Sequence, residues 1–545
     1  MRSAVLIMVG LVAMLSVYGQ TQKFTRQDTL RGTLNAERNW WDVTHYDLNV
    51  QVNPSDSSIS GKNTIHYRVL KANTILQIDL QEPMVIDSIV QLGKSLSYTR
   101  EGNAFHVNIR ALQQPGKVQQ LTVYFHGKPR AAVRAPWDGG FQWSKDSLGR
   151  AWIATACQGL GASVWWPNKD HQSEEADSTS ITVTVPTGLT NVSNGRLRSK
   201  KNNGNGTTTF NWFVNNPINN YDVALNIGHY TEFKDVFNGE KGKLDMSFWV
   251  LDYNVEKAKK HFEVVKPMMK CFEHWFGPYP FYEDSYKLVE TPHLGMEHQS
   301  AVAYGNKYQM GYMGRDLSGS GWGMKWDFLI IHETGHEWFG NNITAKDIAD
   351  MWVHEGFTNY SETIFTQCID GVQAGNEYSQ GIRRNVANDI PVIGHYGVNS
   401  EGSGDMYYKA SNMIHTIRQI MNNDEAFRQL LRGLNKTFYH STVTTAQIEK
   451  YINLKVGRNL SKVYDQYLRT ITIPVFEYKV VNGVLSYRWV SEVKGFDMPL
   501  KVTLSEGRYS FIYPTQQWKT LKLGFKDAAK FEVDKNFYIN IKKVN

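Results

Sequence analysis

Apolar and polar residues alternate in short runs over residues 40–233. Residues 46–52, 64–69 and 181–185 follow this two-residue period. Such alternation predicts strands with one buried and one exposed face. Clusters of turn-forming residues, such as the Asn- and Gly-rich residues 201–206, separate the runs. This part of the chain is therefore expected to form a sandwich or a large curved antiparallel sheet.

The pattern then changes, because apolar residues begin to recur at the helical period. In residues 256–276 they lie close to a 3.6-residue spacing, and Pro267 inside this run is expected to kink or split the helix. Helical character dominates to about residue 469. Beyond it, short alternating runs return on both sides of Asn482-Gly483, a pair typical of a tight β-hairpin turn.

The length and composition indicate several folded domains. At 545 residues the chain exceeds one ordinary hydrophobic core, and 41% hydrophobic residues exclude general disorder. We predict a multidomain α+β protein with a large N-terminal antiparallel β-domain, a mostly helical middle domain and a small C-terminal β-sandwich. The expected boundaries are 1–19 for a signal peptide, then 20–235, 236–470 and 471–545.

The composition also excludes two classes of protein. The net charge of +7 is small for this length, and Lys and Arg are scattered without a long basic run, so no nucleic-acid partner is expected. Cys157, Cys271 and Cys368 are the only thiols, which excludes a small scaffold held together by disulfides. At most one bridge is possible among them, and we expect buried free cysteines at all three positions.

The N-terminal segment resembles a targeting signal. Arg2 gives it a positive start, residues 4–17 are almost wholly apolar, and Gly19 is a small residue at a plausible cleavage edge. The alternative is an anchor that stays in the membrane, but the apolar run is shorter than the roughly 18 residues that span a bilayer. We therefore expect an exported protein, periplasmic or extracellular, with no transmembrane segment after signal cleavage.

The candidate chemistry lies in the sequence His332-Glu333-Thr334-Gly335-His336, with Glu355 following after eighteen intervening residues. On a helix, two histidines four positions apart share one face and can bind one metal ion. Catalytic zinc takes three protein ligands, and two histidines with one glutamate are a known set. We predict that His332, His336 and Glu355 bind one Zn²⁺ ion per chain and that Glu333 is the general base beside it.

The residues around this motif favour a buried helix. Residues 326–339 lack proline and carry apolar side chains at helical spacing on both sides of the motif. The alternative, a surface helix with two solvated histidines, would not have such flanks. Gly335 is expected to mark close packing, and Gly340 with the two asparagines after it is expected to end the helix. Glu362, two helical turns after Glu355, either orients a ligand histidine or forms an ordinary salt bridge.

Three sequence blocks together resemble the M1 family of zinc aminopeptidases, the group that includes aminopeptidase N and leukotriene A4 hydrolase. The first runs from His332 through Asn341 to Glu355, with the spacing of that family. The second, residues 295–298 (Gly-Met-Glu-His), is similar to its G-x-M-E-N motif, although Leu294 and His298 replace a glycine and an asparagine. The third, residues 407–410 (Tyr-Tyr-Lys-Ala), is similar to Y-x-K-G.

The resemblance implies a thermolysin-like catalytic domain that removes the N-terminal residue from peptides by means of a metal-activated water. It implies that Glu297, with Gly295 and Met296 in the same block, holds the free α-amine of the substrate. It also implies that Tyr407 stabilises the oxyanion, and that Gln158 lies beside the first side chain of the substrate. Peptides with a free N-terminus are the partners expected from these roles.

Three other functions use the same residues. A zinc endopeptidase would share the metal site without the amine anchor. A catalytically silent peptide-binding module would keep the fold and bind zinc without turnover. Epoxide hydrolysis, known for one member of the family, is not required by any of these blocks. Cobalt or manganese could occupy the same ligands in vitro, although the ligand set favours zinc.

Overall fold

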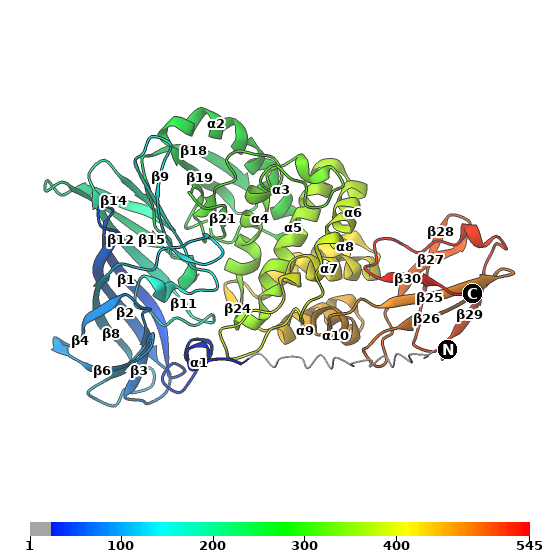
Figure 1. Cartoon of the computed structure of the whole chain (residues 1–545), viewed down its shortest axis with the longest axis horizontal. Helices are drawn as coiled ribbons and strands as arrows, with labels where there is room; N and C mark the ends of the chain where they lie inside the picture. Colours follow the sequence, from blue (N-terminus) through cyan, green and yellow to red (C-terminus); the bar gives the residue numbers. More distant parts are fainter. Residues whose placement is uncertain (1–22) are drawn as a thin grey trace, which may run out of the picture.

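Three regions follow one another along residues 23–545, which this computed structural model describes (Figure 1). A β-rich region lies at one end of the elongated molecule, helices fill the middle, and a small β-region projects at the other end. The fold class expected from the sequence is thereby confirmed. The segment 1–19, expected as a signal peptide, lies outside the described residues.

An eight-stranded sheet forms the N-terminal region, in the order β14-β15-β12-β1-β2-β8-β4-β5. The strands are β1 (Trp41–Asn53), β2 (Ser58–Val69), β4 (Val85–Gln91), β5 (Lys94–Ser95), β8 (Val118–Gly127), β12 (Ser178–Pro186), β14 (Arg196–Asn202) and β15 (Thr207–Val214). All neighbours are antiparallel except β1 and β12, which pair in parallel. Apart from this one pair, the sheet is antiparallel, as the sequence predicts. A long connection separates the two strands, so no hairpin fixes their orientation.

Smaller sheets pack against this one and bring the chain to the centre of the molecule. They contain β3 (Ile75–Asp79), β6 (Ser97–Glu101), β7 (Ala104–Asn108), β9 (Gly140–Lys145), β10 (Ala151–Ala156), β11 (Glu175–Ala176), β13 (Thr190–Val192), β16 (Ile218–Asn219) and β17 (Asn226–Gly228). Four fully buried tryptophans contribute to the core between the sheets: Trp40, Trp41, Trp165 and Trp166. Because β10 ends at Ala156, Gln158 lies only two residues beyond a strand that is fixed in this core.

A five-stranded sheet begins the middle region, in the order β18-β19-β20-β22-β21. Its strands are β18 (Tyr230–Gly239), β19 (Gly242–Leu251), β20 (Tyr286–Glu290), β21 (Gly295–Met296) and β22 (Val302–Tyr304). The helices that follow are α4 (Phe328–Gly335), α5 (Trp352–Asp370), α6 (Val372–Gly381), α7 (Tyr408–Met421), α8 (Asp424–Thr437), α9 (Thr445–Val456) and α10 (Ser461–Leu468). Residue 235, the expected boundary, falls inside β18. A short strand pair, β23 (Ile343–Ala345) with β24 (Ser441–Val443), joins distant parts of this region.

The helix expected over residues 256–276 is split, as its proline predicts. It consists of α2 (Val255–His261) and α3 (Val265–Phe276), with a 3₁₀ turn between them. Pro267 lies in the first turn of α3, where a missing N–H group costs no helical hydrogen bond.

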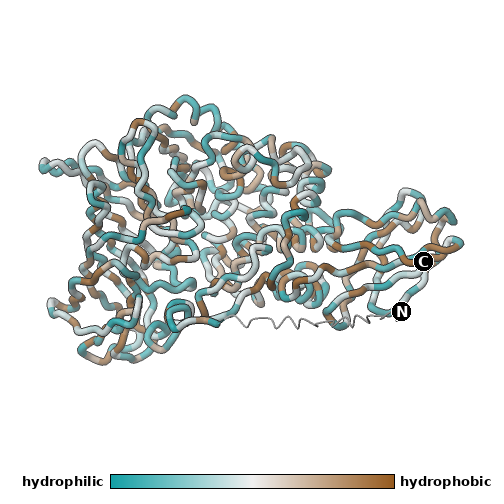
Figure 2. The backbone as a smooth tube through the Cα atoms, viewed as in Figure 1, coloured by the Kyte–Doolittle hydropathy of each residue, from teal (hydrophilic) through white to brown (hydrophobic). Residues whose placement is uncertain are grey.

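The C-terminal region holds a four-stranded sheet and a two-stranded sheet. The strands are β25 (Val475–Val481), β26 (Val484–Val490), β27 (Leu500–Ser505), β28 (Arg508–Ile512), β29 (Lys519–Lys522) and β30 (Asn540–Lys543). Asn482 and Gly483 connect β25 to β26 with φ of 49° and 77°, the left-handed conformation that a two-residue hairpin needs, so the expected turn is confirmed. Hydrophobic positions run through all three regions rather than collecting in one band (Figure 2).

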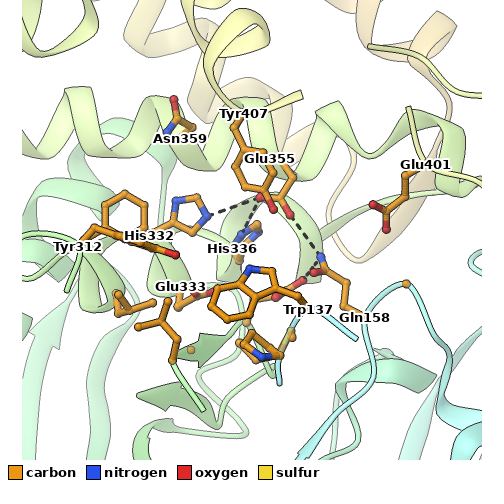
Figure 3. A pocket seen from close by; sticks show the side chains of 18 of the residues that line it. Trp137, Gln158, Tyr312, His332, Glu333, His336, Glu355, Asn359, Glu401 and Tyr407 are labelled. Carbon is orange, nitrogen blue, oxygen red and sulfur yellow. Dashed lines mark hydrogen bonds and ion pairs between the residues drawn. The ribbon is translucent and has the colours of Figure 1, made fainter. Parts of the chain in front are cut away.

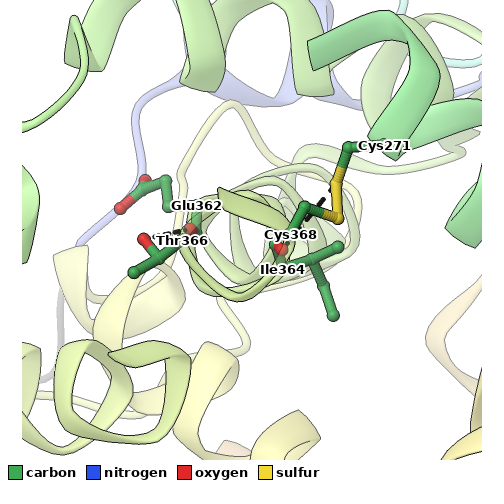
Figure 4. Close-up of a disulfide and its surroundings, with 5 residues drawn as sticks. All are labelled: Cys271, Glu362, Ile364, Thr366 and Cys368. Carbon is green, nitrogen blue, oxygen red and sulfur yellow. Dashed lines mark hydrogen bonds between the residues drawn. A yellow bond between two sulfur atoms is a disulfide. The ribbon is translucent and has the colours of Figure 1, made fainter. Parts of the chain in front are cut away.

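A disulfide joins Cys271 on α3 to Cys368 near the end of α5, across 97 residues of sequence (Figure 4). The expectation of three free thiols is therefore wrong for these two, while Cys157 is free and buried as expected. The sequence could not select this pair, because only packing of the two helices brings the thiols together.

Candidate functional site

Helix α4 brings the first candidate residues to the centre of the molecule. Asp327 caps the helix by accepting a hydrogen bond from the backbone N–H of Leu329 at 2.9 Å. His332 and His336 then lie on one face, with ring centroids 5.0 Å apart. A Cβ on Gly335 would lie 2.5 Å from Ser361 Oγ, so the close packing expected at this glycine is confirmed.

Helix α4 ends at Gly335 and passes into a π-helical segment, Glu337–Asn341, in which Phe339 and Gly340 leave the helical conformation, in agreement with the stop expected at Gly340. The chain turns at Phe339 and Gly340, whose φ of 134° favours glycine. This turn aims the carbonyl of Phe339 back at the ring of His336, 3.0 Å from Nδ1. The glycine therefore shapes the site as well as ending the helix.

Both histidine rings are held through Nδ1. His332 Nδ1 lies 2.7 Å from Glu362 Oε1, and His336 Nδ1 contacts the carbonyl of Phe339. A ring that donates from Nδ1 keeps the lone pair on Nε2 for a metal ion. Both Nε2 atoms face Glu355, so the i, i+4 spacing gives the arrangement that the sequence predicts.

Glu355 lies in the first turn of α5 and completes the cluster (Figure 3). Its Oε2 atom is 3.3 Å from His336 Nε2 and 3.6 Å from His332 Nε2. Burial opposes ionisation of this carboxyl, but His336 and His332 hold its pKa well below the usual range. Among the described residues Oε2 has no hydrogen-bond partner although it is buried. Two imidazoles and a carboxylate with an unsatisfied oxygen fit a zinc ion.

Glu333 lies beside this cluster on the wall of the same cavity. Burial raises its pKa to about 7. A second group of donor atoms, from Glu297, Glu333 and His336, also lies within 4.8 Å. We assign the metal to His332, His336 and Glu355 because each of those histidines is fixed through its other ring nitrogen.

Glu297 directly follows β21, and its carboxylate lies within 4.8 Å of ligand atoms of Glu333 and His336. Gln158 Nε2 donates to Glu297 Oε1 at 2.6 Å and to Glu355 Oε1 at 3.3 Å, and the Tyr221 hydroxyl donates to Glu297 Oε1 at 3.0 Å. A Cβ on Gly295 would lie 2.8 Å from Glu333 Oε1, so a larger residue would displace that carboxylate. Met296 lines the cavity beside them.

Tyr407 and Tyr408 both line the cavity, but they have different neighbours. The ring of Tyr407 stacks on His332 with centroids 5.9 Å apart, and its side chain points toward Glu355 in Figure 3. Burial and the carboxylate of Glu355 raise the pKa of Tyr407, so that its hydroxyl stays protonated and can donate. Tyr408 lies nearer Glu362 and Tyr312, whose charges affect its pKa.

These residues share one cavity of about 620 Å³. The nine residues predicted from the sequence to bind metal, bind substrate or act in catalysis all line it: Gln158, Gly295, Met296, Glu297, His332, Glu333, His336, Glu355 and Tyr407. The sequence did not single out Trp137, Asp138 or Glu401, which also line it. These three lie in irregular segments, where no period or motif marks a residue as facing a cavity.

Two family profiles match the chain. Residues 43–221 match the peptidase M1 N-terminal domain, and residues 260–467 match the peptidase family M1 domain. Puromycin-sensitive aminopeptidase of Caenorhabditis elegans is 22% identical over 456 residues, which cover 80% of this chain and 47% of that protein. Leucine aminopeptidase 2 of Vanderwaltozyma polyspora is 23% identical, covering 74% and 57%. The chain thus spans about half the length of these relatives.

Solved structures share the fold. A crystal structure of an M1 zinc metallopeptidase mutant from Deinococcus radiodurans bound to a Tyr-Ser-Ala substrate is similar with a TM-score of 0.66 and 19% identity. The similarity covers 81% of this chain and 97% of that one. A structure of the same kind bound to L-arginine has a TM-score of 0.66 and 20% identity.

Proposed function

Because the chain belongs to the M1 family of peptidases, we propose that it is a zinc-dependent aminopeptidase that hydrolyses the N-terminal residue from peptides. The observation that carries the proposal is the position of Glu297. Its carboxylate, fixed by Gln158 and Tyr221, shares one cavity with the cluster of His332, His336 and Glu355. A site for a charged amine therefore lies next to a site for a metal ion.

His332, His336 and Glu355 would hold the zinc ion through two Nε2 atoms and one carboxylate. When bound, zinc supplies a Lewis acid and lowers the pKa of water toward about 7. Glu362 keeps the ring of His332 in place for this task through the contact at Nδ1.

Glu333 is the proposed general base. It accepts a proton as the water oxygen attacks the scissile carbonyl carbon, and it returns that proton to the amine nitrogen as the C–N bond breaks. Its burial in the cavity favours both steps, since a pKa near 7 suits a group that takes up and releases a proton at neutral pH.

Glu297 limits cleavage to the first residue. The Glu297 carboxylate pairs with the charged α-amine of the substrate. The peptide bond that reaches the metal cluster is therefore the one after the first residue. The hydrogen bonds from Gln158 and Tyr221 fix the carboxylate before the substrate arrives. An endopeptidase has no use for such an anchor, and this favours the aminopeptidase.

Tyr407 is the proposed donor to the oxyanion that forms on the substrate carbonyl. Its hydroxyl lies beside Glu355, at the edge of the metal cluster, and remains protonated. A hydrogen bond that forms fully only in the transition state speeds the chemical step.

The chain is also proposed to be exported. The basic and apolar pattern of residues 2–17 is typical of a secretory signal. The disulfide between Cys271 and Cys368 is consistent with an oxidising compartment (Figure 4). Among the helices of residues 23–545, none combines the length and the apolar character needed to cross a bilayer.

A fluorogenic screen tests the activity. Aminoacyl-aminomethylcoumarin substrates, their N-acetylated forms and internally quenched peptides are assayed with and without a chelator. We expect hydrolysis of the free-amine substrates alone, loss of activity with chelator and recovery on adding zinc. Cleavage of acetylated and free substrates at equal rates would instead assign an endopeptidase, and zinc binding without any turnover would assign a silent binding module.

A further inference from the structure

The cavity is lined by carboxylates without a matching cation. Five acidic residues line it: Asp138, Glu297, Glu333, Glu355 and Glu401. No lysine or arginine is among its lining residues in the described part of the chain. Zinc with the substrate amine accounts for part of this negative charge, so each carboxylate has to be considered separately.

Four of the five carboxylates already have a role or a partner. Glu355 faces the metal position, Glu333 is the proposed base, and Glu297 binds the amine. Asp138 accepts hydrogen bonds from the backbone N–H groups of Val133 at 2.6 Å and Arg134 at 2.9 Å, which hold its pKa below the usual range. Of the five lining carboxylates, Glu401 is the one without an assigned role or a hydrogen-bond partner in the part of the chain that the structure describes.

Glu401 has no side-chain partner of its own. It is half-buried, and within residues 23–545 its carboxylate forms no hydrogen bond or ion pair. The charge of Arg31 acts on Glu401, but its guanidinium group is already paired with Asp170 at 3.5 Å and donates to Asn399 Oδ1 at 2.9 Å. A partly buried carboxylate without a partner gains most from a cationic ligand.

The position of Glu401 places it near the first residue of a bound substrate. A Cβ built on Gly159 would lie 3.2 Å from Glu401 Oε1, and Gly159 directly follows Gln158, which contacts Glu297. In Figure 3, Glu401 lies on the Gln158 side of the cavity, away from Tyr312. A side chain that leaves the residue anchored at Glu297 can extend in this direction.

An aromatic ring completes the surroundings. Trp137 lines the same cavity and is 64% exposed, and in Figure 3 it also lies toward Gln158. An exposed indole face attracts ammonium and guanidinium groups. The combination of a free carboxylate and an exposed indole suits a positively charged side chain and disfavours an acidic one.

We propose that Glu401 is a specificity-determining residue that selects peptides whose first residue is lysine or arginine. The proposal rests on the aminopeptidase function proposed above and names its substrate class. The side-chain ammonium or guanidinium group lies against the carboxylate of Glu401, with Trp137 at the rim.

The test compares a charged substrate with a neutral one of similar shape. Values of kcat/KM are measured for lysyl- and norleucyl-aminomethylcoumarin with the zinc-loaded full chain. We expect the wild type to prefer lysine by roughly tenfold or more, and Glu401→Gln to lower this ratio by about 10- to 100-fold. The matched control is Asp138→Asn, which also removes a lining carboxylate, and its ratio is expected to stay at the wild-type value.

Three outcomes would overturn the proposal. If the wild type hydrolyses norleucine as well as lysine, Glu401 does not select charge, although the aminopeptidase function stands. If the wild type prefers lysine and folded Glu401→Gln keeps that preference, another residue is responsible. If the zinc-loaded wild type hydrolyses no substrate of either kind, both the function and its specificity fail. Inhibition of the wild type by free lysine and free norleucine gives the same comparison if the variant does not fold.

Discussion

Glu362 Oε1 lies 2.7 Å from Nδ1 of His332, on the side of the ring opposite the metal position. Asn359 donates to the same oxygen at 2.8 Å, and the Tyr378 hydroxyl donates to the other oxygen. Asn359 and Tyr378 therefore hold the Glu362 carboxylate in the position from which it contacts His332. Of the two readings that the sequence allowed, orientation of a ligand histidine is the one that this geometry favours.

Replacing Glu362 by glutamine is expected to weaken zinc binding by about 10- to 100-fold, because the histidine loses a charged partner that makes it a better ligand. Competition with a chromogenic chelator measures the change. Tyr378→Phe, which removes only a donor to Glu362, should have a smaller effect. Unchanged zinc affinity in Glu362→Gln would show that the ring is held by packing alone.

Glu333→Gln is expected to keep stoichiometric zinc and to lower kcat by about 10²- to 10⁴-fold, since the amide cannot accept the proton from water. The amide has nearly the same shape, so the contact with Gly295 is preserved. Metal analysis and steady-state kinetics on the same preparation separate the two effects. Full activity in the zinc-loaded variant would reject Glu333 as the base.

Tyr407→Phe is expected to lower kcat by about 10²- to 10³-fold with little change in KM, because its hydrogen bond to the oxyanion forms in the transition state. Tyr408→Phe is the matched control, being the adjacent residue with the same chemistry and a different neighbourhood. Its kcat should stay close to the wild-type value. The reverse pattern would assign the oxyanion to Tyr408.

Glu297→Gln is expected to raise KM for free-amine substrates. It should also weaken inhibition by a free amino acid far more than inhibition by its N-acetylated form, because only the free amino acid carries the charge that Glu297 binds. A loss of roughly 10- to 100-fold in kcat/KM corresponds to one charged hydrogen bond. Tyr221→Phe removes a hydrogen bond to Glu297 but leaves the carboxylate in place, so it should lower kcat/KM by a smaller factor. Equal weakening of inhibition by the free and the N-acetylated amino acid would mean that Glu297 acts through the shape of the cavity and not through its charge.

Periodicity and motif spacing predicted those parts of the molecule that depend on local chemistry. The alternating runs became β1, β2 and β12, and the spacing of His332 and His336 placed both on one helical face. The parallel pairing of β1 with β12 and the bridge from Cys271 to Cys368 depend on contacts between distant segments. Glu401 was missed for the same reason, because only the folded chain brings its loop beside Gln158.

The side chain of Glu175 offers a test of stability away from the metal. It lies in β11, one of its carboxylate oxygens is buried without a partner among the described residues, and burial raises its pKa to about 7. The folded protein thus binds a proton here more tightly than the unfolded chain does, whose carboxyl titrates near 4.5. Stability is therefore lost as pH rises from about 4.5 to about 7, and the full loss persists above that range.

Glu175→Gln removes this titration and keeps a side chain of similar size. We expect the variant to be more stable than the wild type at pH 8, by at most about 3 kcal/mol, and the difference to vanish near pH 4.5. Thermal unfolding of both proteins in the presence of chelator measures it without interference from zinc release. The exposed Glu263→Gln is the control, because the same change in solvent should leave the midpoint unaltered at both pH values. A stability difference that does not depend on pH would mean that Glu175 acts through its shape and not through its charge.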